Sequence, residues 1–132
     1  MNSHVQCERI TEHLRGRYGT EAEHLWVQYP SYSVFRHPFS RKWYAIIMDI
    51  PRNRLGLVGD RIITVINVKC SPLMVGSLLA EPGFFPAYHM NKTSWVSILL
   101  DDTVPDDKLF TLLELSYDSV TPRRKKKPRS TD

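Results

Sequence analysis

Lysine and arginine side chains gather in two segments of the 132-residue chain. Between residues 36 and 69 there are seven basic residues and two acidic ones. Five of these seven lie in two stretches rich in turn-forming residues: Arg36, Arg41, Lys42, Arg52 and Arg54. Residues 122–132 hold six more: Arg123, Arg124, Lys125, Lys126, Lys127 and Arg129. Such cations bind phosphate oxygens, so both segments are candidates for contact with a DNA backbone.

The positive charge of the chain resides almost wholly in its last residues. The chain carries a formal charge of +4, and residues 122–132 alone carry +5, so residues 1–121 sum to −1. Binding of DNA by residues 1–121 would therefore depend on local clustering of cations. An alternative stays open for both segments, because solvated loops are commonly basic and a terminal basic run can serve solubility alone.

No motif typical of an enzyme occurs in the sequence, so we expect a non-enzymatic protein. Phosphate-binding glycine loops, nucleophile elbows and zinc-ligand spacings are all missing. The two cysteines lie far apart, and both are expected as reduced thiols. Cys70 precedes a predicted helix, whose dipole would lower its thiol pKa, although a buried and inert cysteine is the reading that we favour.

Other potential metal ligands have simpler explanations, and we expect neither a metal nor a cofactor. Four histidines have no ligand spacing and are predicted to lie at the surface: His4, His13, His24 and His37. Four carboxylates are predicted to cap and complement the start of the last helix: Asp101, Asp102, Asp106 and Asp107.

Hydrophobic periodicity predicts one α+β domain over residues 1–121, followed by a disordered basic tail over 122–132. A capping box formed by Ser3 and Gln6 predicts a helix that ends at Gly19. Three β-rich runs, 32–36, 43–50 and 61–69, predict an antiparallel meander. A short helix should follow from Ser71 to about residue 82, then a strand at 94–100 and a helix at 105–120. The predicted order is α-β-β-β-α-β-α.

The two basic stretches between residues 36 and 60 flank the same predicted strand. In a meander they emerge at opposite ends of that strand, roughly 26 Å apart at ~3.3 Å per residue. They cannot form one pocket, but they could straddle a DNA duplex, whose helical turn is about 34 Å. No apolar stretch approaches the roughly 20 residues that cross a bilayer, and the first residues lack the pattern of a signal peptide. We therefore expect a cytoplasmic protein with no membrane partner.

Residues 86–96, with the sequence PAYHMNKTSWV, resemble the signature of the MmcQ/YjbR family, in which His-x-Asn-Lys is followed by Trp. Residues 67–72, 104–106 and 115–117 are similar to further motifs of that family, and the resemblance runs from about residue 3 to residue 120. It implies a frataxin-like (CyaY-like) fold, an antiparallel sheet with helices packed on one side. It does not extend to the iron binding of frataxins, because the first helix offers only Glu8 and Glu12 among several arginines.

Members of the MmcQ/YjbR family are described as DNA-binding proteins with a double-wing motif. The resemblance implies that the two basic loops are the wings, although fold similarity alone is a weak basis for function. The alternative is a protein-interaction or small-ligand module with a cleft near residues 88–92. The family-signature residues fit either a structural role or that cleft: His89, Asn91, Lys92 and Trp95.

Overall fold

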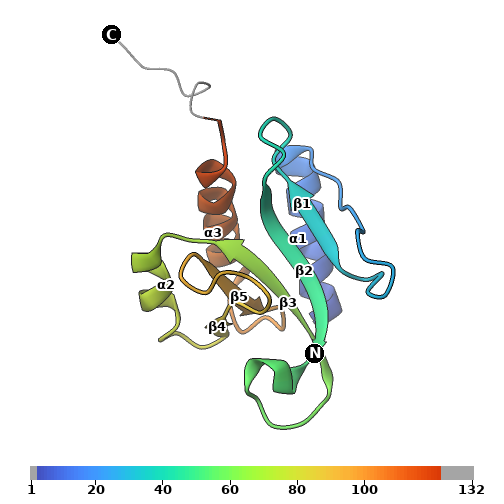
Figure 1. Ribbon diagram of the computed structural model, residues 1–132, viewed down its shortest axis with the longest axis vertical. Helices are drawn as coiled ribbons and strands as arrows, with labels where there is room; N and C mark the ends of the chain where they lie inside the picture. The colour runs from blue at the N-terminus through green and yellow to red at the C-terminus, as the bar shows by residue number, and fades with distance from the viewer. Residues whose placement is uncertain (1–2, 123–132) are drawn as a thin grey trace.

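A five-stranded antiparallel sheet in the order β1-β2-β3-β5-β4 organises the protein (Figure 1). The computed structural model describes residues 3–122, so the predicted basic tail lies almost entirely outside the described residues. The strands are β1 (Ser33–Arg36), β2 (Trp43–Pro51), β3 (Ile62–Lys69), β4 (Phe84–Pro86) and β5 (Trp95–Leu99). The helices are α1 (Ser3–Tyr18), α2 (Pro72–Leu78), α3 (Asp106–Ser119) and the short 3₁₀ helix η1 (Arg52–Leu55). The α+β class and the order of the predicted elements are confirmed.

Strand β4 is an addition to the predicted order. Its three residues pair with β5 at the edge of the sheet, where Pro86 costs no ladder hydrogen bond. Gly83 leads into the strand with φ +90°, and a Cβ at this position would lie 2.7 Å from Cγ2 of Val104. Only glycine fits here, because both the backbone angle and the space exclude a side chain.

Helices α1 and α3 lie side by side against one face of the sheet, behind the strands in the view of Figure 1. Their buried apolar residues recur at helical spacing, among them Ile10 and Leu14 of α1 and Leu109 and Leu113 of α3. The sheet meets them with Phe35, Ala45, Ile47, Ile66, Val68, Val96 and Ile98. Helix α2 starts as predicted, since the Ser71 side chain accepts a hydrogen bond from the backbone N–H of Met74. This helix-covered face forms the larger apolar core.

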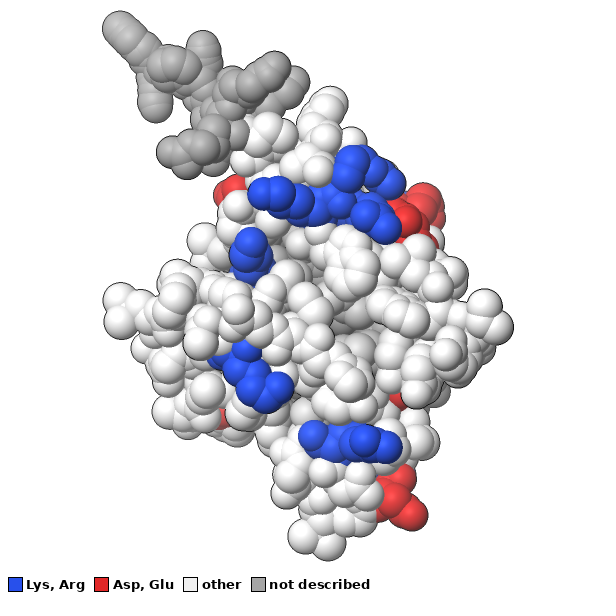
Figure 2. Space-filling model, viewed as in Figure 1, with Lys and Arg blue, Asp and Glu red and all other residues white. Residues whose placement is uncertain are grey.

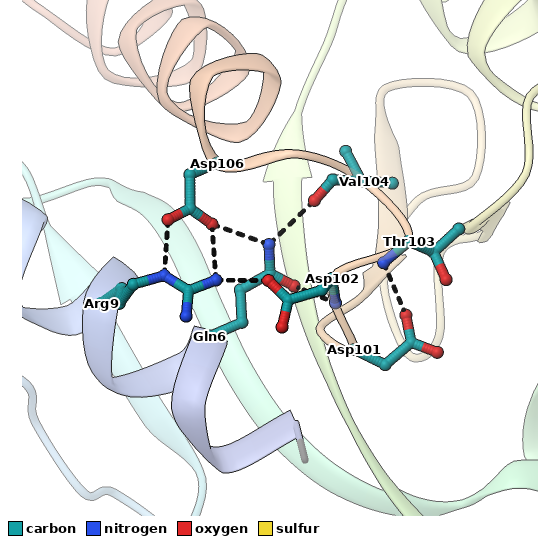
Figure 3. Close-up of polar contacts among 7 residues, drawn as sticks. All are labelled: Gln6, Arg9, Asp101, Asp102, Thr103, Val104 and Asp106. Atoms are coloured by element: carbon teal, nitrogen blue, oxygen red, sulfur yellow. Dashed lines mark hydrogen bonds and ion pairs between the residues drawn. The ribbon is translucent and has the colours of Figure 1, made fainter. Parts of the chain in front are cut away.

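The predicted capping box at the start of α1 is wrong for Gln6. Its fully buried amide donates to the Val104 carbonyl (2.8 Å) and to Asp106 (2.9 Å), and accepts from the backbone N–H of Asp102 (2.8 Å). Arg9 pairs with Asp106, at 2.6 Å from Nε to Oδ2, and with Asp102 (Figure 3). The hydrogen bond from Arg9 is the main cause of the lowered pKa of Asp106. The N-cap of α3 is Pro105 without a side-chain cap hydrogen bond, so the predicted capping by aspartate is wrong, although Asp106 and Asp107 lie in the first turn, where the helix dipole favours them. Asp102 and Asp106 join α1 to the start of α3 and to the loop before it.

A β-bulge interrupts the pairing of β1 with β2. Phe35 pairs with Ala45, whereas the next residue, Arg36, pairs with Trp43, so Tyr44 is an extra residue on β2. Tyr44 and Ala45 consequently both pack in the helix-covered core, although they are neighbours in the chain. Trp43 packs on the other side of the sheet.

Residues 3–122 offer neither a membrane-spanning helix nor a cluster of metal-binding side chains. No helix in this range is long and apolar enough to cross a membrane. Within the same range, no three side chains of His, Cys, Asp or Glu are grouped so that they could hold a metal ion.

Candidate functional site

The second face of the sheet, which we call the open face, is covered by loops and not by α1 or α3. Its apolar strand residues are Val34, Ile46, Met48, Ile50, Ile63, Val65 and Trp95. Strand alternation adds Asn67, Lys69 and Ser97 to this side. Two irregular segments lie over these residues: one brings Trp26 and Tyr32, and the other brings Ala87, Tyr88 and Met90.

The loops leave a cleft of about 370 Å³ on the open face, which we call the aromatic cleft. Six of its lining residues have rings: Trp26, Tyr29, Tyr32, Trp43, Tyr88 and His89. The others are Ile46, Met48, Asn67 and Met90. This volume falls within the range of small-molecule sites in proteins, and so does a lining that is mostly apolar with few polar groups.

The rings of the aromatic cleft pack on one another, so the cleft exists without a ligand. Trp26 meets Trp43 edge-to-face at 5.8 Å between centroids, and Tyr29 stacks on Tyr32 at 4.8 Å. Burial is the main cause of the raised pKa of Tyr32. The neighbouring Tyr88 and Tyr29 add to this rise, and the positive charge of Arg54 opposes it. Tyr29 is 50% exposed, so one side of the stacked pair is available to a ligand.

A buried polar network fastens the segment that carries Tyr88 and His89. The Ser97 hydroxyl donates to Oδ1 of Asn67 (2.6 Å) and accepts from the backbone N–H of Tyr88 (2.9 Å). Nδ2 of Asn67 donates to the Tyr88 carbonyl (2.9 Å), and both Asn67 and Ser97 are fully buried. His89 then takes a left-handed backbone conformation (φ 62°), with its ring 4.0 Å from that of Tyr88. The network fixes one wall of the aromatic cleft.

Cations surround this face, and they divide into free and paired groups. Among residues 3–122, the side chains of Lys42, Arg54 and Lys69 make no hydrogen bond or ion pair. Arg36 and Arg41 are different, because both pair with Glu23, at 3.0 Å and 3.6 Å. Figure 2 shows a hollowed centre without charged groups, with Lys and Arg groups above it, to its left and below it, and with acidic groups toward the margin.

The two basic loops emerge at opposite ends of β2, as predicted (Figure 1). Lys42 directly precedes Trp43 at one end, and η1 with Arg54 directly follows β2 at the other. Arg52 is half-buried, and its Nε has no hydrogen-bond partner in residues 3–122. The predicted tail cations, residues 123–127, lie outside the described residues.

His37 organises the loop between β1 and β2 and is not the surface residue that the sequence predicted. It is 2% exposed, and its Nδ1 accepts hydrogen bonds from the backbone N–H groups of Phe39 (3.0 Å) and Ser40 (3.3 Å). Its Nε2 lies 3.2 Å from the hydroxyl of Thr121, just beyond α3. Burial lowers the pKa of His37, while the negative charge of Asp118 opposes this shift. A neutral imidazole thus joins this basic loop to the end of α3.

The four signature residues separate into different roles. His89 lines the aromatic cleft, and Trp95 is buried in the core beneath the open face. Asn91 shapes its own turn by accepting from the backbone N–H and the hydroxyl of Thr93, and Lys92 donates to the Ala87 carbonyl (2.7 Å). Asn91 and Lys92 are exposed and do not line the aromatic cleft.

Cys70 does not share a site with His89. Its side chain is buried in the helix-covered core, where burial raises the pKa of the thiol to about 11. His89 lies on the open face of the sheet. The structure therefore contradicts a lowered thiol pKa at the start of α2 and agrees with a buried cysteine.

Comparisons with known proteins place this architecture in a family. A sequence model described as YjbR matches residues 15–119. The chain belongs to the YjbR family. The chain is similar to the uncharacterized protein YyaQ of Bacillus subtilis, with 37% identity over 110 residues, or 83% of this chain and 93% of YyaQ. The predicted MmcQ/YjbR resemblance is confirmed.

Two solved structures resemble this YjbR protein along most of its length. A crystal structure of a Pseudomonas syringae protein aligns with a TM-score of 0.85 and 38% identity, covering 92% of this chain and all of that one (100%). A crystal structure of the Deinococcus radiodurans protein DR2400 aligns with a TM-score of 0.63 and 25% identity, covering 85% of this chain and 78% of that one.

Sequence reasoning for this YjbR chain missed most of the aromatic cleft. Trp26 and Tyr29 lie in a segment without periodicity, and Tyr32 and Trp43 have the pattern of ordinary strand residues. The available signal was the density of aromatic residues from 26 to 44, which exceeds what one amphipathic strand needs. Asn67, a fully buried polar residue inside an apolar strand, was the other signal.

Proposed function

We propose that this YjbR protein binds DNA without catalysing a reaction, and that it contacts backbone phosphates with the cations around the open face. The observation that carries the proposal is the set of unpaired cations at both ends of β2 and beside the aromatic cleft, namely Lys42, Arg54 and Lys69. The open-face strand positions themselves bear no carboxylate. Cations without partners lose little on meeting a phosphate and release counterions from the DNA.

The pairing of Arg36 and Arg41 with Glu23 reduces the number of predicted residues that are free to contact phosphate. A guanidinium that already has a carboxylate partner gains less from a phosphate than a free one does. We therefore assign the main contacts of the two loops to Lys42 and Arg54, with Arg52 beside them. Arg36 and Arg41 serve mainly to hold the loop in place through Glu23. The basic residues 123–127 would add binding without sequence preference.

A salt titration of duplex binding tests the proposal. The double variant Lys42→Glu, Arg54→Glu should bind at least tenfold more weakly, and the slope of log K against log salt should fall by about two, one for each lost phosphate contact. Fluorescence anisotropy with a labelled duplex at several salt concentrations measures both quantities. A chain that ends at residue 122 should also show a shallower slope while still binding at low salt.

The matched control is the double variant Arg17→Glu, Lys108→Glu, which changes the net charge equally on the helices. Arg17 pairs with Glu114 and Lys108 pairs with Glu81, both on the helix side of the molecule. This control should leave the slope unchanged. Equal losses in both double variants would mean that only net charge matters, and loss of all binding on removal of residues 123–132 would assign DNA binding to the tail alone.

The aromatic cleft supports a second candidate, a small-ligand module. The cleft has a volume of about 370 Å³, its rings pack on one another, and a buried network fixes one wall, so it is a preformed site. The predicted cleft near residues 88–92 is thus only partly the one observed, since Tyr88, His89 and Met90 line it and Asn91 and Lys92 do not. Saturable quenching of tryptophan fluorescence by an uncharged aromatic compound, insensitive to salt, would favour this candidate over DNA binding.

A further inference from the structure

We propose that the aromatic cleft holds one unpaired base of a DNA strand, so that the protein prefers single-stranded to duplex DNA. This inference rests on the proposed function and names the form of its ligand. In a duplex both faces of every base are covered by neighbouring bases, whereas a single strand can turn a base outward. A cleft built from rings serves an exposed base face, and a uniform duplex surface offers it nothing to stack on.

The shape and lining of the aromatic cleft fit a flat aromatic group. Tyr29 is 50% exposed and lies nearly parallel to Tyr32, with an interplanar angle of 13°, so a base can extend this stack. Trp26 and Trp43 stand edge-to-face with an interplanar angle of 82°, which gives the cleft a corner. The floor is aliphatic, with Ile46 and Met48. These surfaces bind a ring by its faces and leave its polar edge to other groups.

Asn67 holds a wall of the aromatic cleft and does not read the base. Its Oδ1 accepts from Ser97, its Nδ2 donates to the Tyr88 carbonyl, and the side chain is fully buried. The rings therefore supply the contact with the base, and every base has a flat face that can stack on them. We infer weak sequence preference.

Charge decides in favour of a nucleotide over an uncharged aromatic ligand. Lys42 immediately precedes the cleft residue Trp43, and Lys69 lies two positions beyond Asn67 on the same side of β3. Both side chains lack an ion-pair partner within residues 3–122. A strand that places a base in the cleft carries phosphates on either side of it, which these two cations can meet. An apolar peptide would use the rings and leave the cations unpaired.

Anisotropy with three labelled ligands tests this inference on the full chain: a single strand of mixed sequence, its duplex, and the same strand with abasic sites throughout its middle. The single strand should bind about tenfold more tightly than either of the others, which corresponds to about 1.4 kcal/mol, within the range for stacking one base. Its binding should also quench the fluorescence of Trp26 and Trp43. A free nucleotide should quench only at far higher concentration, because it lacks the flanking phosphates.

A substitution at Tyr29 separates stacking from charge. Tyr29→Ala should remove most of the preference for the single strand and leave duplex affinity unchanged, whereas Tyr29→Phe should keep the preference because it retains the ring. Since Tyr29 is half-exposed, its replacement should leave the fold intact, which circular dichroism checks. The comparison of intact with abasic strands needs no variant and stands by itself.

The outcomes distinguish this inference from the proposed function. Equal affinity for the single strand, the abasic strand and the duplex would overturn the inference and leave DNA binding through phosphates in place. Absence of binding to all three at low salt would overturn the proposed function, and the inference would fall with it. Quenching by the free nucleotide as strong as by the strand would assign the cleft to a small ligand, and would also overturn the inference.

Discussion

The two faces of the sheet are both apolar but are covered in different ways. Regular helices cover one face, and their periodic side chains fill the space against Ile47, Ile66 and Ile98. Irregular segments cover the other face, and there large rings bridge the gaps but leave a cleft of about 370 Å³. Helical packing closes a surface because side chains of similar size repeat along it. A loop covering closes it only in part, and this is how the same sheet provides both a core and a candidate binding site.

The largest expected effect is a difference in unfolding free energy when a buried side chain is truncated to alanine on one face or on the other. Ile66→Ala removes a fully buried side chain beneath the helices and should cost about 3 kcal/mol of unfolding free energy, because a sealed cavity remains. Met48→Ala on the floor of the aromatic cleft should cost about half as much, since the lost volume merges with space that already exists. Urea unfolding of both variants measures the difference. Equal costs would show that the open face is as tightly closed as the other.

Two buried serines, one on each face of the sheet, allow a second comparison, with an intermediate loss of unfolding free energy. Ser116 donates to the Tyr44 carbonyl (2.6 Å) and accepts from the backbone N–H of Lys69 (3.0 Å), so it joins α3 to the sheet. Ser97 makes the same kinds of bonds to Asn67 and Tyr88 on the open face. Each change to alanine leaves two buried groups unpaired and should cost about 2 kcal/mol.

Amide hydrogen exchange should separate the two serine variants. Ser97→Ala should speed the hydrogen exchange of the Tyr88 amide and lower the affinity of the aromatic cleft for any ligand. Ser116→Ala should leave that exchange rate and that affinity unchanged, and should speed the exchange of the Lys69 amide at the end of β3. If Ser97→Ala sped amide exchange in the helices as much as in the segment that carries Tyr88, the two faces would be coupled and not independent.

The smallest effect concerns pH and the loop that borders the open face. His37 has a lowered pKa in the folded protein and an ordinary pKa of about 6.5 when unfolded. The unfolded chain therefore binds the proton more readily, so the stability contributed by neutral His37 is present above about pH 6.5 and is lost as pH falls toward the folded pKa. Protonation would place an N–H on Nδ1 opposite the N–H groups of Phe39 and Ser40.

Urea midpoints between pH 7.5 and about 5.5 measure this loss. His37→Gln should be less stable at neutral pH and less sensitive to acid than the unaltered protein. Part of the sensitivity should persist, because burial and the nearby Arg17 also lower the pKa of His13. An unchanged pH profile in His37→Gln would show that the hydrogen bonds to Nδ1 do not hold this loop.

Local patterns were sufficient to predict most of the fold. The stripe of Ile10 and Leu14, the serine cap at Ser71 and the β-branched runs of β2 and β3 each involve residues near in sequence, so periodicity reveals them. Gln6 shows the limit of such patterns. Its spacing from Ser3 fits a capping box, yet its partners lie about a hundred residues away, and no local rule could show them.

The candidate site was less predictable because it depends on contacts between distant segments. Charge counting found Arg36 and Arg41 but could not show that both pair with Glu23. It also gave no prominence to Lys69, which strand pairing places on the open face near Asn67. The rings of the aromatic cleft come from segments that only the antiparallel sheet brings together. His89 of the family signature lines the aromatic cleft, but the signature did not distinguish it from the core residue Trp95.

The bulge in β2 has a consequence for how freely this region can change length. Side chains along a strand switch sides at every residue, so the number of residues between Ala45 and the β1–β2 loop works like a reading frame. The bulge lets Tyr44 and Ala45 both face the helices while Trp43 faces the aromatic cleft, whereas regular alternation over the same three residues would turn the indole toward the helices. A YjbR relative of the same length here must therefore keep the bulge to offer an indole at this place, and a relative that lacks the extra residue can offer one from a regular strand.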